Sequence, residues 1–225
     1  MSSEEPTIAG GAPRLAVGID PGRNGAACLI EGTRLLLVAS WRPSQKAGRA
    51  GYAVSIRSCG REFARWRATP NEIGRDVVGE IVRIAGPSPA LLVGVEEVYV
   101  GCNVSTAISL ARMSGALSGP VEALSGGPAR YVAAAGWRAS VIGLARRATA
   151  REDAKRLAME RIPPLVEGWT LLVGNNTEHI ADAVGIALAT LQPPTEKKHG
   201  KKRRDGGGRA GVRLLARPAS TTGNL

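Results

Sequence analysis

The stretch ALLVGVEE, residues 90–97, joins an apolar run to two adjacent carboxylates. An apolar run such as Leu91-Leu92-Val93 is typical of a buried strand. Adjacent residues of a strand point to opposite faces of its sheet, so at most one of Glu96 and Glu97 can face a shared site. Two glutamates at a strand end can also be simply solvated. The interpretation therefore depends on whether other parts of the chain place acidic side chains at the same end of the sheet.

The stretches on either side of residues 90–97 predict an α/β sheet. RLAVGID (14–20) is expected to form one strand, and GAACLIEGTRLLLVAS (25–40) two more with a turn between them. Residues 41–70 are polar and rich in Arg and Gly, which is compatible with an extra hairpin or with a mobile loop. Three strands followed by alternating helices and strands indicate a sheet covered by helices. Helices are expected at 71–86, 103–119, 150–162 and 178–191, and a short strand, a turn and a further element at 129–143.

Composition divides the chain into one folded domain and two tails. Residues 1–13 are polar with Gly and Pro, and residues 193–225 are rich in Lys, Arg, Gly and Pro, so neither segment can build a core. The expected domain spans residues 14–192. The formal net charge of the chain is +11, of which the C-terminal tail supplies nine Lys or Arg against two acids. That tail favours a polyanionic partner, most simply nucleic acid, although a solvated disordered end accounts for it equally well.

The remaining composition excludes several classes of protein. No apolar run reaches membrane-spanning length, and the polar, acidic N-terminus does not resemble a signal peptide. A soluble cytoplasmic protein without a membrane partner is therefore expected. The three cysteines, Cys28, Cys59 and Cys102, are widely spaced and form no CxxC pair, which argues against a disulfide framework or a zinc site.

Acidic side chains recur at positions that can share one end of the sheet. Asp20 ends the first predicted strand, and Pro21-Gly22 turns the chain away from it. Ligands of open α/β sheets gather beyond the carboxyl ends of the strands, so Asp20 and Glu96 converge if their strands are parallel neighbours. The last predicted helix adds His179 and Asp182, whose spacing of three places them on one helical face.

Three carboxylates in one place repel one another unless they are protonated or bridged by cations. Hard cations such as Mg²⁺ take oxygen ligands, and two of them roughly 4 Å apart suit in-line displacement at a phosphodiester. The positive charge of the chain matches such a substrate. The pattern predicts a nuclease site in which Glu96 is a metal ligand and Glu97, on the opposite strand face, is not.

Each of these elements has an ordinary structural explanation when it is taken alone. Asp-Pro-Gly is common turn chemistry, and an Asp after a strand also occurs in the phosphate loops of sugar kinases and actin-like proteins. Glu178-His179 at a helix start can serve only for capping and for compensation of the helix dipole. The four residues together, in this order and on these elements, favour a site.

The sequence resembles the RuvC-type Holliday junction resolvases, a family with the ribonuclease H-like fold. The resemblance covers about Leu15 to Leu191. It implies a mixed sheet, with a three-strand meander followed by alternating helices and strands, and helices on both faces. It rests on VGIDPGRNGAA (17–27), VGVEEVYVGCNVSTAISLARMSGAL (93–117), WRASVIG (137–143) and EHIADAVGIALATL (178–191).

The resemblance also implies roles for individual residues. The metal-binding acids fall on Asp20, Glu96 and Asp182, and His179 falls where the family carries a further Asp or a His. Tyr99 falls on an aromatic position that engages bases at the junction. The implied basic DNA contacts are Arg138 and Arg151, with Lys155 close enough to Arg151 that the register between them is open.

Three features depart from the family pattern. Residues 41–70 do not match it, the basic tail is not part of its core, and Glu97 stands where a neutral residue is more usual. These departures are compatible with a phage or mobile-element relative.

The implied activity is that of a Mg²⁺-dependent endonuclease that resolves four-way DNA junctions by paired nicks, leaving 5′-phosphate and 3′-hydroxyl ends. Two Mg²⁺ ions per active site are expected, with Mn²⁺ as a substitute. The expected partners are branched DNA, a second copy bound through the small-residue helix near residues 103–118, and a branch-migration helicase. The expected location is the cytoplasm of a bacterium or of a phage-infected cell.

The alternatives are a catalytically silent DNA-binding relative, a nuclease acting on RNA:DNA hybrids or simple duplexes, and an actin-like or sugar-kinase protein, for which the chain is too short.

Overall fold

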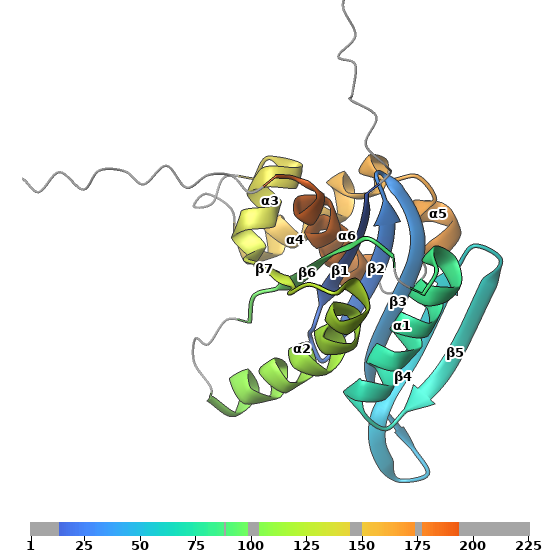
Figure 1. Cartoon of the computed structure of the whole chain (residues 1–225). Helices are drawn as coiled ribbons and strands as arrows, with labels where there is room; N and C mark the ends of the chain where they lie inside the picture. The colour runs from blue at the N-terminus through green and yellow to red at the C-terminus, as the bar shows by residue number, and fades with distance from the viewer. Residues whose placement is uncertain (1–13, 88, 99–103, 145–149, 174–176, 194–225) are drawn as a thin grey trace, which may run out of the picture. The chain divides into compact units, whose positions relative to one another are not determined.

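Seven strands form one mixed sheet in the computed structural model of the protein, with helices on both faces of the sheet (Figure 1). The structure describes residues 14–87, 89–98, 104–144, 150–173 and 177–193. The strands are β1 (Leu15–Asp20), β2 (Gly25–Glu31), β3 (Arg34–Lys46), β4 (Arg49–Ser58), β5 (Arg61–Arg67), β6 (Leu91–Glu96) and β7 (Arg130–Val132). The helices are α1 (Pro70–Ala85), α2 (Val104–Ser125), α3 (Ala134–Ile142), α4 (Arg151–Arg161), the 3-10 turn η1 (Pro163–Leu165), α5 (Trp169–Leu172) and α6 (Thr177–Leu191).

The strand order is β5-β4-β3-β2-β1-β6-β7. Strands β1 to β5 form an antiparallel meander, and β6 and β7 continue the sheet in parallel on the other side of β1. This order confirms the predicted ribonuclease H-like α/β fold. The meander has five strands rather than the predicted three, because β3 runs on to Lys46 and β4 and β5 follow it. Residues 41–70 therefore form the extra hairpin and not a loop.

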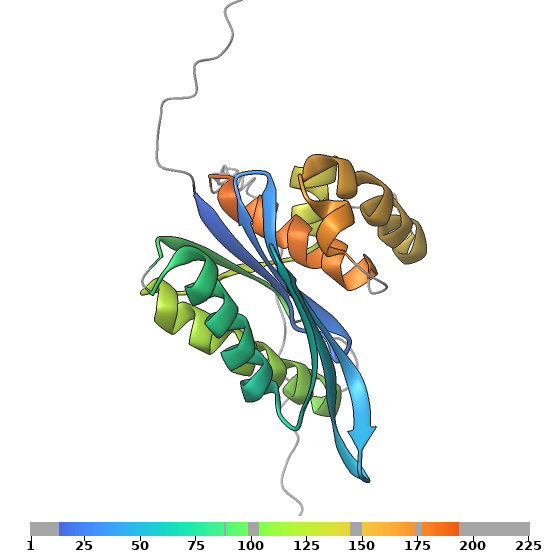
Figure 2. The same cartoon turned by 90° about the vertical axis from the view of Figure 1, so that its right-hand side faces the viewer.

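The sheet separates two apolar cores. Figure 2 shows the sheet nearly edge-on, with helices on either side of it. Helix α6 packs on β1, β2 and β6 on one face, with α3 and α4 beside it, and α1 and α2 cover the other face. Along β1, Ala16 belongs to the α6 core, whereas Val17 and Ile19 belong to the other. Because strand residues alternate between faces, Gly18 and Asp20 lie on the α6 face.

Two glycines allow α6 to lie close to the sheet. Gly18 of β1 is the register partner of Gly94 of β6. A Cβ atom on Gly18 would overlap the backbone carbonyl of Ala183, and one on Gly94 would overlap the hydroxyl of Thr190. The α6 backbone therefore rests directly on the two central strands, one step along the same face from the acid that ends each strand.

Ion pairs fasten the outer strands to α1. Asp76 accepts hydrogen bonds of 2.6 and 2.8 Å from Arg67, and its carboxylate lies 3.5 Å from Nη1 of Arg65. Buried Glu80 pairs with Arg61 at 3.3 Å. These arginines pair with acids of the helix, one of them buried, which explains how a polar stretch without a strong strand pattern becomes part of the sheet.

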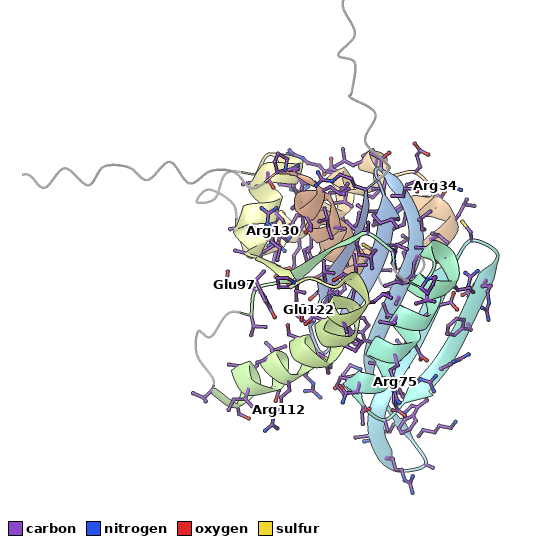
Figure 3. The ribbon with its side chains drawn as sticks, viewed as in Figure 1. Arg34, Arg75, Glu97, Arg112, Glu122 and Arg130 are labelled. Atoms are coloured by element: carbon purple, nitrogen blue, oxygen red, sulfur yellow. The ribbon has the colours of Figure 1, made fainter. Side chains whose placement is uncertain are left out.

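The predicted helices are present, with some changes at their ends. Helix α1 ends at Ala85, one residue before the predicted end, and its C-cap residue Gly86 has a φ of 94°. Helix α2 continues through Pro120 to Ser125, beyond the predicted end at Gly119. Arg130, labelled in Figure 3, donates hydrogen bonds to carbonyls at the C-terminal end of α6. The short helices η1 and α5 were not predicted. No helix in the described part of the chain combines the length and apolarity needed to cross a membrane.

Candidate active site

Asp20, Glu96 and Asp182 line one cleft at the carboxyl ends of β1 and β6. The two strands are parallel neighbours, with Ile19 opposite Val95, so the acids that follow these residues lie at the same level of the sheet. Helix α6 brings Asp182 to the same place from above. The cleft has a volume of about 580 Å³. Its other polar lining residues are Asn24, Glu97, Arg138, Lys155, Glu178 and His179.

Asp20 is buried and is held by two hydrogen bonds. Its Oδ2 atom lies 2.7 Å from Nδ1 of His179, and its Oδ1 atom accepts a bond of 3.2 Å from the backbone N–H of Gly22. The Gly22 carbonyl in turn accepts a 3.0 Å bond from Nε1 of buried Trp41 on β3. Trp41 of the meander thus holds the turn after β1 in place, and the turn holds Asp20 through Gly22.

Asp182 is also buried, and Arg138 of α3 is its partner. Nη2 of Arg138 donates to Oδ1 of Asp182 at 3.2 Å. The guanidinium lies over the ring of Trp137, 5.0 Å from its centroid. Trp137 is fully buried and its ring packs on Gly185 of α6. The residue implied as a DNA contact therefore lies inside the cleft and neutralises one of its acids.

The electrostatics of the cleft favour protons or cations. Burial, followed by repulsion from Asp20 and Asp182, raises the pKa of Glu96 to about 8. Burial also raises the pKa of Asp182 to about 6, against the opposing effect of Arg138. The hydrogen bond to Asp20 raises the pKa of His179. The carboxyl groups of Glu96 and Asp182 therefore hold their protons to a higher pH than ordinary carboxyls, and a bound cation would favour their ionised forms.

The donor set suits a hard cation, since carboxylate oxygens are the ligands that Mg²⁺ prefers. Within the described residues, however, no three His, Cys, Asp or Glu side chains are arranged as a metal site. Two of the carboxylates are instead bound to His179 and Arg138. The residues fit a divalent ion in their chemistry, and such an ion would compete with His179 and Arg138 for these carboxylates.

The remaining predicted residues are spread around the cleft or lie outside the described residues. Lys155 of α4 lines the cleft and pairs with Glu178 at 2.6 Å. Arg151 begins α4, and Tyr99 lies outside the described residues. Glu97, labelled in Figure 3, follows the last residue of β6 and is exposed. It also lines the cleft. The expected separation of Glu97 from the cleft by strand alternation is not found, because the strand ends at Glu96.

Sequence reasoning named the acids, His179 and Arg138, but did not predict that His179 pairs with Asp20 and Arg138 with Asp182. The Arg138–Asp182 and His179–Asp20 pairs join residues far apart in the chain, and no local pattern signals them. Trp41 was also missed, since its role depends on β3 passing beneath the turn after β1. A tryptophan in a polar stretch was the available signal.

No protein-family model matches the chain, and no curated protein matches its sequence. Among solved structures, the chain is similar to that of Thermus thermophilus RuvC, with 16% identity and a TM-score of 0.42 over 78% of this chain and 92% of the other. It is also similar to T. thermophilus RuvC in complex with Holliday junction substrate, with 15% identity and a TM-score of 0.41 over 78% and 91% of the two chains. The assignment of the fold rests on the strand order and directions given above.

Proposed function

We propose that the protein is a divalent-metal-dependent endonuclease that cuts branched DNA, with the four-way junction as its substrate. The observation that carries the proposal is the convergence of Asp20, Glu96 and Asp182, from two strands and a helix, in one cleft. Such a set of carboxylates suits phosphodiester hydrolysis, and the charge of the chain suits a nucleic acid. Paired nicks that leave 5′-phosphate and 3′-hydroxyl ends are the proposed outcome.

Asp20, Glu96 and Asp182 are the proposed ligands of Mg²⁺, with His179 as a further ligand or a proton carrier. A bound divalent ion supplies charge neutralisation and a more acidic water. The contact of Nδ1 of His179 with Asp20 fixes the ring and leaves Nε2 to exchange a proton. Arg138 holds Asp182 in the absence of substrate and is proposed to transfer its hydrogen bond to a phosphate oxygen. Lys155 adds positive charge at the cleft.

The proposed assembly is a homodimer, since a two-fold substrate suits a two-fold protein. Two large apolar side chains of α2 support an interface there, because Val104 is 70% exposed and Ile108 is 46% exposed. Tyr99, just before α2, stays a predicted contact to junction bases, and Arg151 a predicted contact to the backbone. A branch-migration helicase and a cytoplasmic location with DNA remain part of the proposal.

A catalytically silent DNA-binding relative is the second candidate. It is favoured by one observation: His179 and Arg138 already bind two of the three acids, as an ion would. The two candidates differ in whether the phosphodiester bond is broken.

The deciding experiment incubates the purified protein with labelled four-way junctions and with duplex controls, in Mg²⁺ and in EDTA. Symmetric nicks in junctions with Mg²⁺, and none with EDTA, are expected. Junction binding without cleavage in either Mg²⁺ or Mn²⁺ would establish the silent relative instead. Equal cleavage of duplex and junction would contradict the proposed substrate but not the nuclease.

A further inference from the structure

The open face of the outer sheet lies beside the candidate active site: His179 lines the cleft and the next residue, Ile180, lines a groove on that face. In register, Asp20 is opposite Ala26 of β2, and Ala26 is opposite Ser40 of β3. The same row continues through Ser55 of β4 to Ala64 of β5. Directly paired residues point to the same face of a sheet, so this row leads from Asp20 across four strand spacings of about 4.8 Å each.

The row forms the floor of a groove, because its outer members are small. The groove has a volume of about 350 Å³ and lies between β3–β5 and the side chains of Leu172 and Ile180. Arg42 and Arg57 flank the floor. Burial along β4 alternates accordingly: Val54 and Ile56 are buried in the core on the α1 side, and Ala53, Ser55 and Arg57 are partly exposed on the groove side.

The far end of the groove carries cations without acids. Residues 41–55 contain Arg42, Lys46 and Arg49 and no Asp or Glu. All three are exposed, and none forms an ion pair with another residue in the described part of the chain. Their register places Arg42, and the Lys46–Arg49 pair at the hairpin tip, on the groove face.

The opposite face of the same strands differs in its charge. There Arg61, Arg65 and Arg67 are neutralised by Asp76 and Glu80 of α1. Within the groove itself, Arg57 pairs with Glu62 at 2.6 Å. The arginines of one face hold the strands on the helix, and the cations of the other face remain available to a ligand.

The hairpin also extends in the direction from which a substrate must approach. β3 runs parallel to β1 and passes the level of Asp20 at Ser40. From Ser40 to Lys46, at roughly 3.3 Å per residue, it projects roughly 20 Å past that level. Figure 2 shows the β3–β4 hairpin reaching beyond the helices.

We infer that this groove and hairpin, the β3–β5 ribbon face, form a second nucleic-acid contact, which binds the phosphate backbone of a DNA arm leading away from the cleft. The inference rests on the proposed function for the identity of the ligand. A floor of small Ser and Ala side chains leaves room for a backbone, and Arg and Lys side chains without ion-pair partners bind phosphates independently of sequence. The ribbon thus positions the substrate and takes no part in the chemistry.

The test compares two full-length variants with equal loss of charge. Arg42→Gln/Arg49→Gln removes two cations of the ribbon face, and Arg61→Gln/Arg65→Gln removes two cations of the helix face. Binding of labelled junction and duplex is titrated with salt in EDTA, where no cleavage occurs. Each phosphate contact contributes about −0.9 to the slope of log affinity against log salt. The ribbon-face variant is expected to have a slope shallower by about 1.8, two such contacts, and the helix-face variant an unchanged slope.

Equal salt slopes for the wild type and the ribbon-face variant would overturn the inference. An equal reduction of the slope in both variants would also overturn it, because it would indicate a diffuse effect of net charge. Melting temperatures, measured alongside, show that both variants fold. The proposed function can fail separately. If the wild type cuts no junction in Mg²⁺ but the ribbon-face variant still has the shallower slope, the inferred ribbon contact stands and the proposed nuclease activity is contradicted. Absence of any DNA binding by the wild type would overturn both.

Discussion

The proposed role of Glu96 as a metal ligand can be tested directly, together with the roles of the two aspartates. Asp20→Asn, Glu96→Gln and Asp182→Asn each remove one proposed ligand with little change of shape. Each is expected to lower junction cleavage by at least two orders of magnitude, about 2.7 kcal/mol of activation barrier. Binding of the junction should survive, since loss of a negative charge does not weaken attraction to phosphate. Single-turnover cleavage and gel-shift binding measure the two effects.

Glu97→Gln is the matched control for these variants. It changes the same charge on the adjacent residue, which lies past the strand end and is exposed. It should retain cleavage. Full activity of Glu96→Gln together with loss of activity in Glu97→Gln would reverse the assignment of the two glutamates.

The raised pKa of Glu96 makes stability depend on pH in a defined direction. Its carboxyl has a pKa of about 8 when folded against an ordinary value of 4.5, so the folded state holds a proton that the unfolded state releases. The corresponding stability is fully present below about pH 4.5 and is lost as the pH rises through about 8. The raised pKa values of Asp182 and His179 act in the same direction.

In EDTA the melting temperature is therefore expected to fall between about pH 5.5 and about pH 8.5, and less steeply for Glu96→Gln. Mg²⁺ should raise it more at the higher pH, where the ligands are ionised. Differential scanning fluorimetry at both pH values, with and without Mg²⁺, measures this without recourse to activity. Parallel curves for wild type and Glu96→Gln would contradict the assignment of the proton to Glu96.

At the scale of single residues, the sequence was sufficient to name the acids, and insufficient to predict the pairs that they form with His179 and Arg138. Asp20 and Glu96 end strands that are recognisable from their apolar runs, and the i, i+3 spacing of His179 and Asp182 is visible in the chain. The binding of Asp182 by Arg138 depends on how α3 sits against α6, with Trp137 packed on Gly185. Contacts of that kind are set by packing and have no signature in spacing.

At the scale of elements, the close packing of α6 on the sheet is the critical contact. Gly18→Ala places a methyl group against the Ala183 backbone, and overpacking of this kind costs about 1–3 kcal/mol of the free energy of unfolding. Because α6 carries Asp182, its displacement should lower cleavage as well. Chemical denaturation and junction cleavage measure the two losses.

Gly79→Ala is the corresponding control. Gly79 lies in α1, is exposed, and an added Cβ would meet no atom within 4 Å. Alanine at such a helical position should stabilise the protein by about 0.5–1 kcal/mol. A Gly18→Ala protein as stable and active as wild type would show that α6 does not need its close approach.

The ribbon shows where prediction of elements from the sequence fails. The strands of the sheet centre have continuous apolar runs because both of their faces are covered. The strands β4 and β5 each have one open face, and the covered face of β5 carries arginines paired with Asp76 and Glu80 in place of an apolar run, so the alternation of β5 is masked. Pro43 within β3 further weakens the local signal. The acids that stabilise these strands lie on α1, outside the window of any local pattern.

At the scale of the whole molecule, the basic tail remains a prediction, because residues 194–225 lie outside the described residues. Truncation after Gln192 removes nine Lys or Arg. A cationic arm contacts phosphates without geometric demands, so its loss should make the salt slope shallower by several units, at about 0.9 per phosphate contact. Duplex and junction binding should weaken by similar factors, and cleavage of saturating junction should persist. An unchanged slope would indicate that the tail does not contact DNA.

The docking of α6 on Gly18 and Gly94 also has a consequence for biosynthesis. At about 5–20 residues per second, β6 leaves the ribosome on the order of ten seconds before α6. During that interval the strand acids are present, but Asp182, His179 and the helix that covers the glycine pair are still unmade. A nascent or prematurely terminated chain therefore contains no assembled cleft. Synthesis order alone restricts the proposed cutting activity to chains that have been translated through to their last helix.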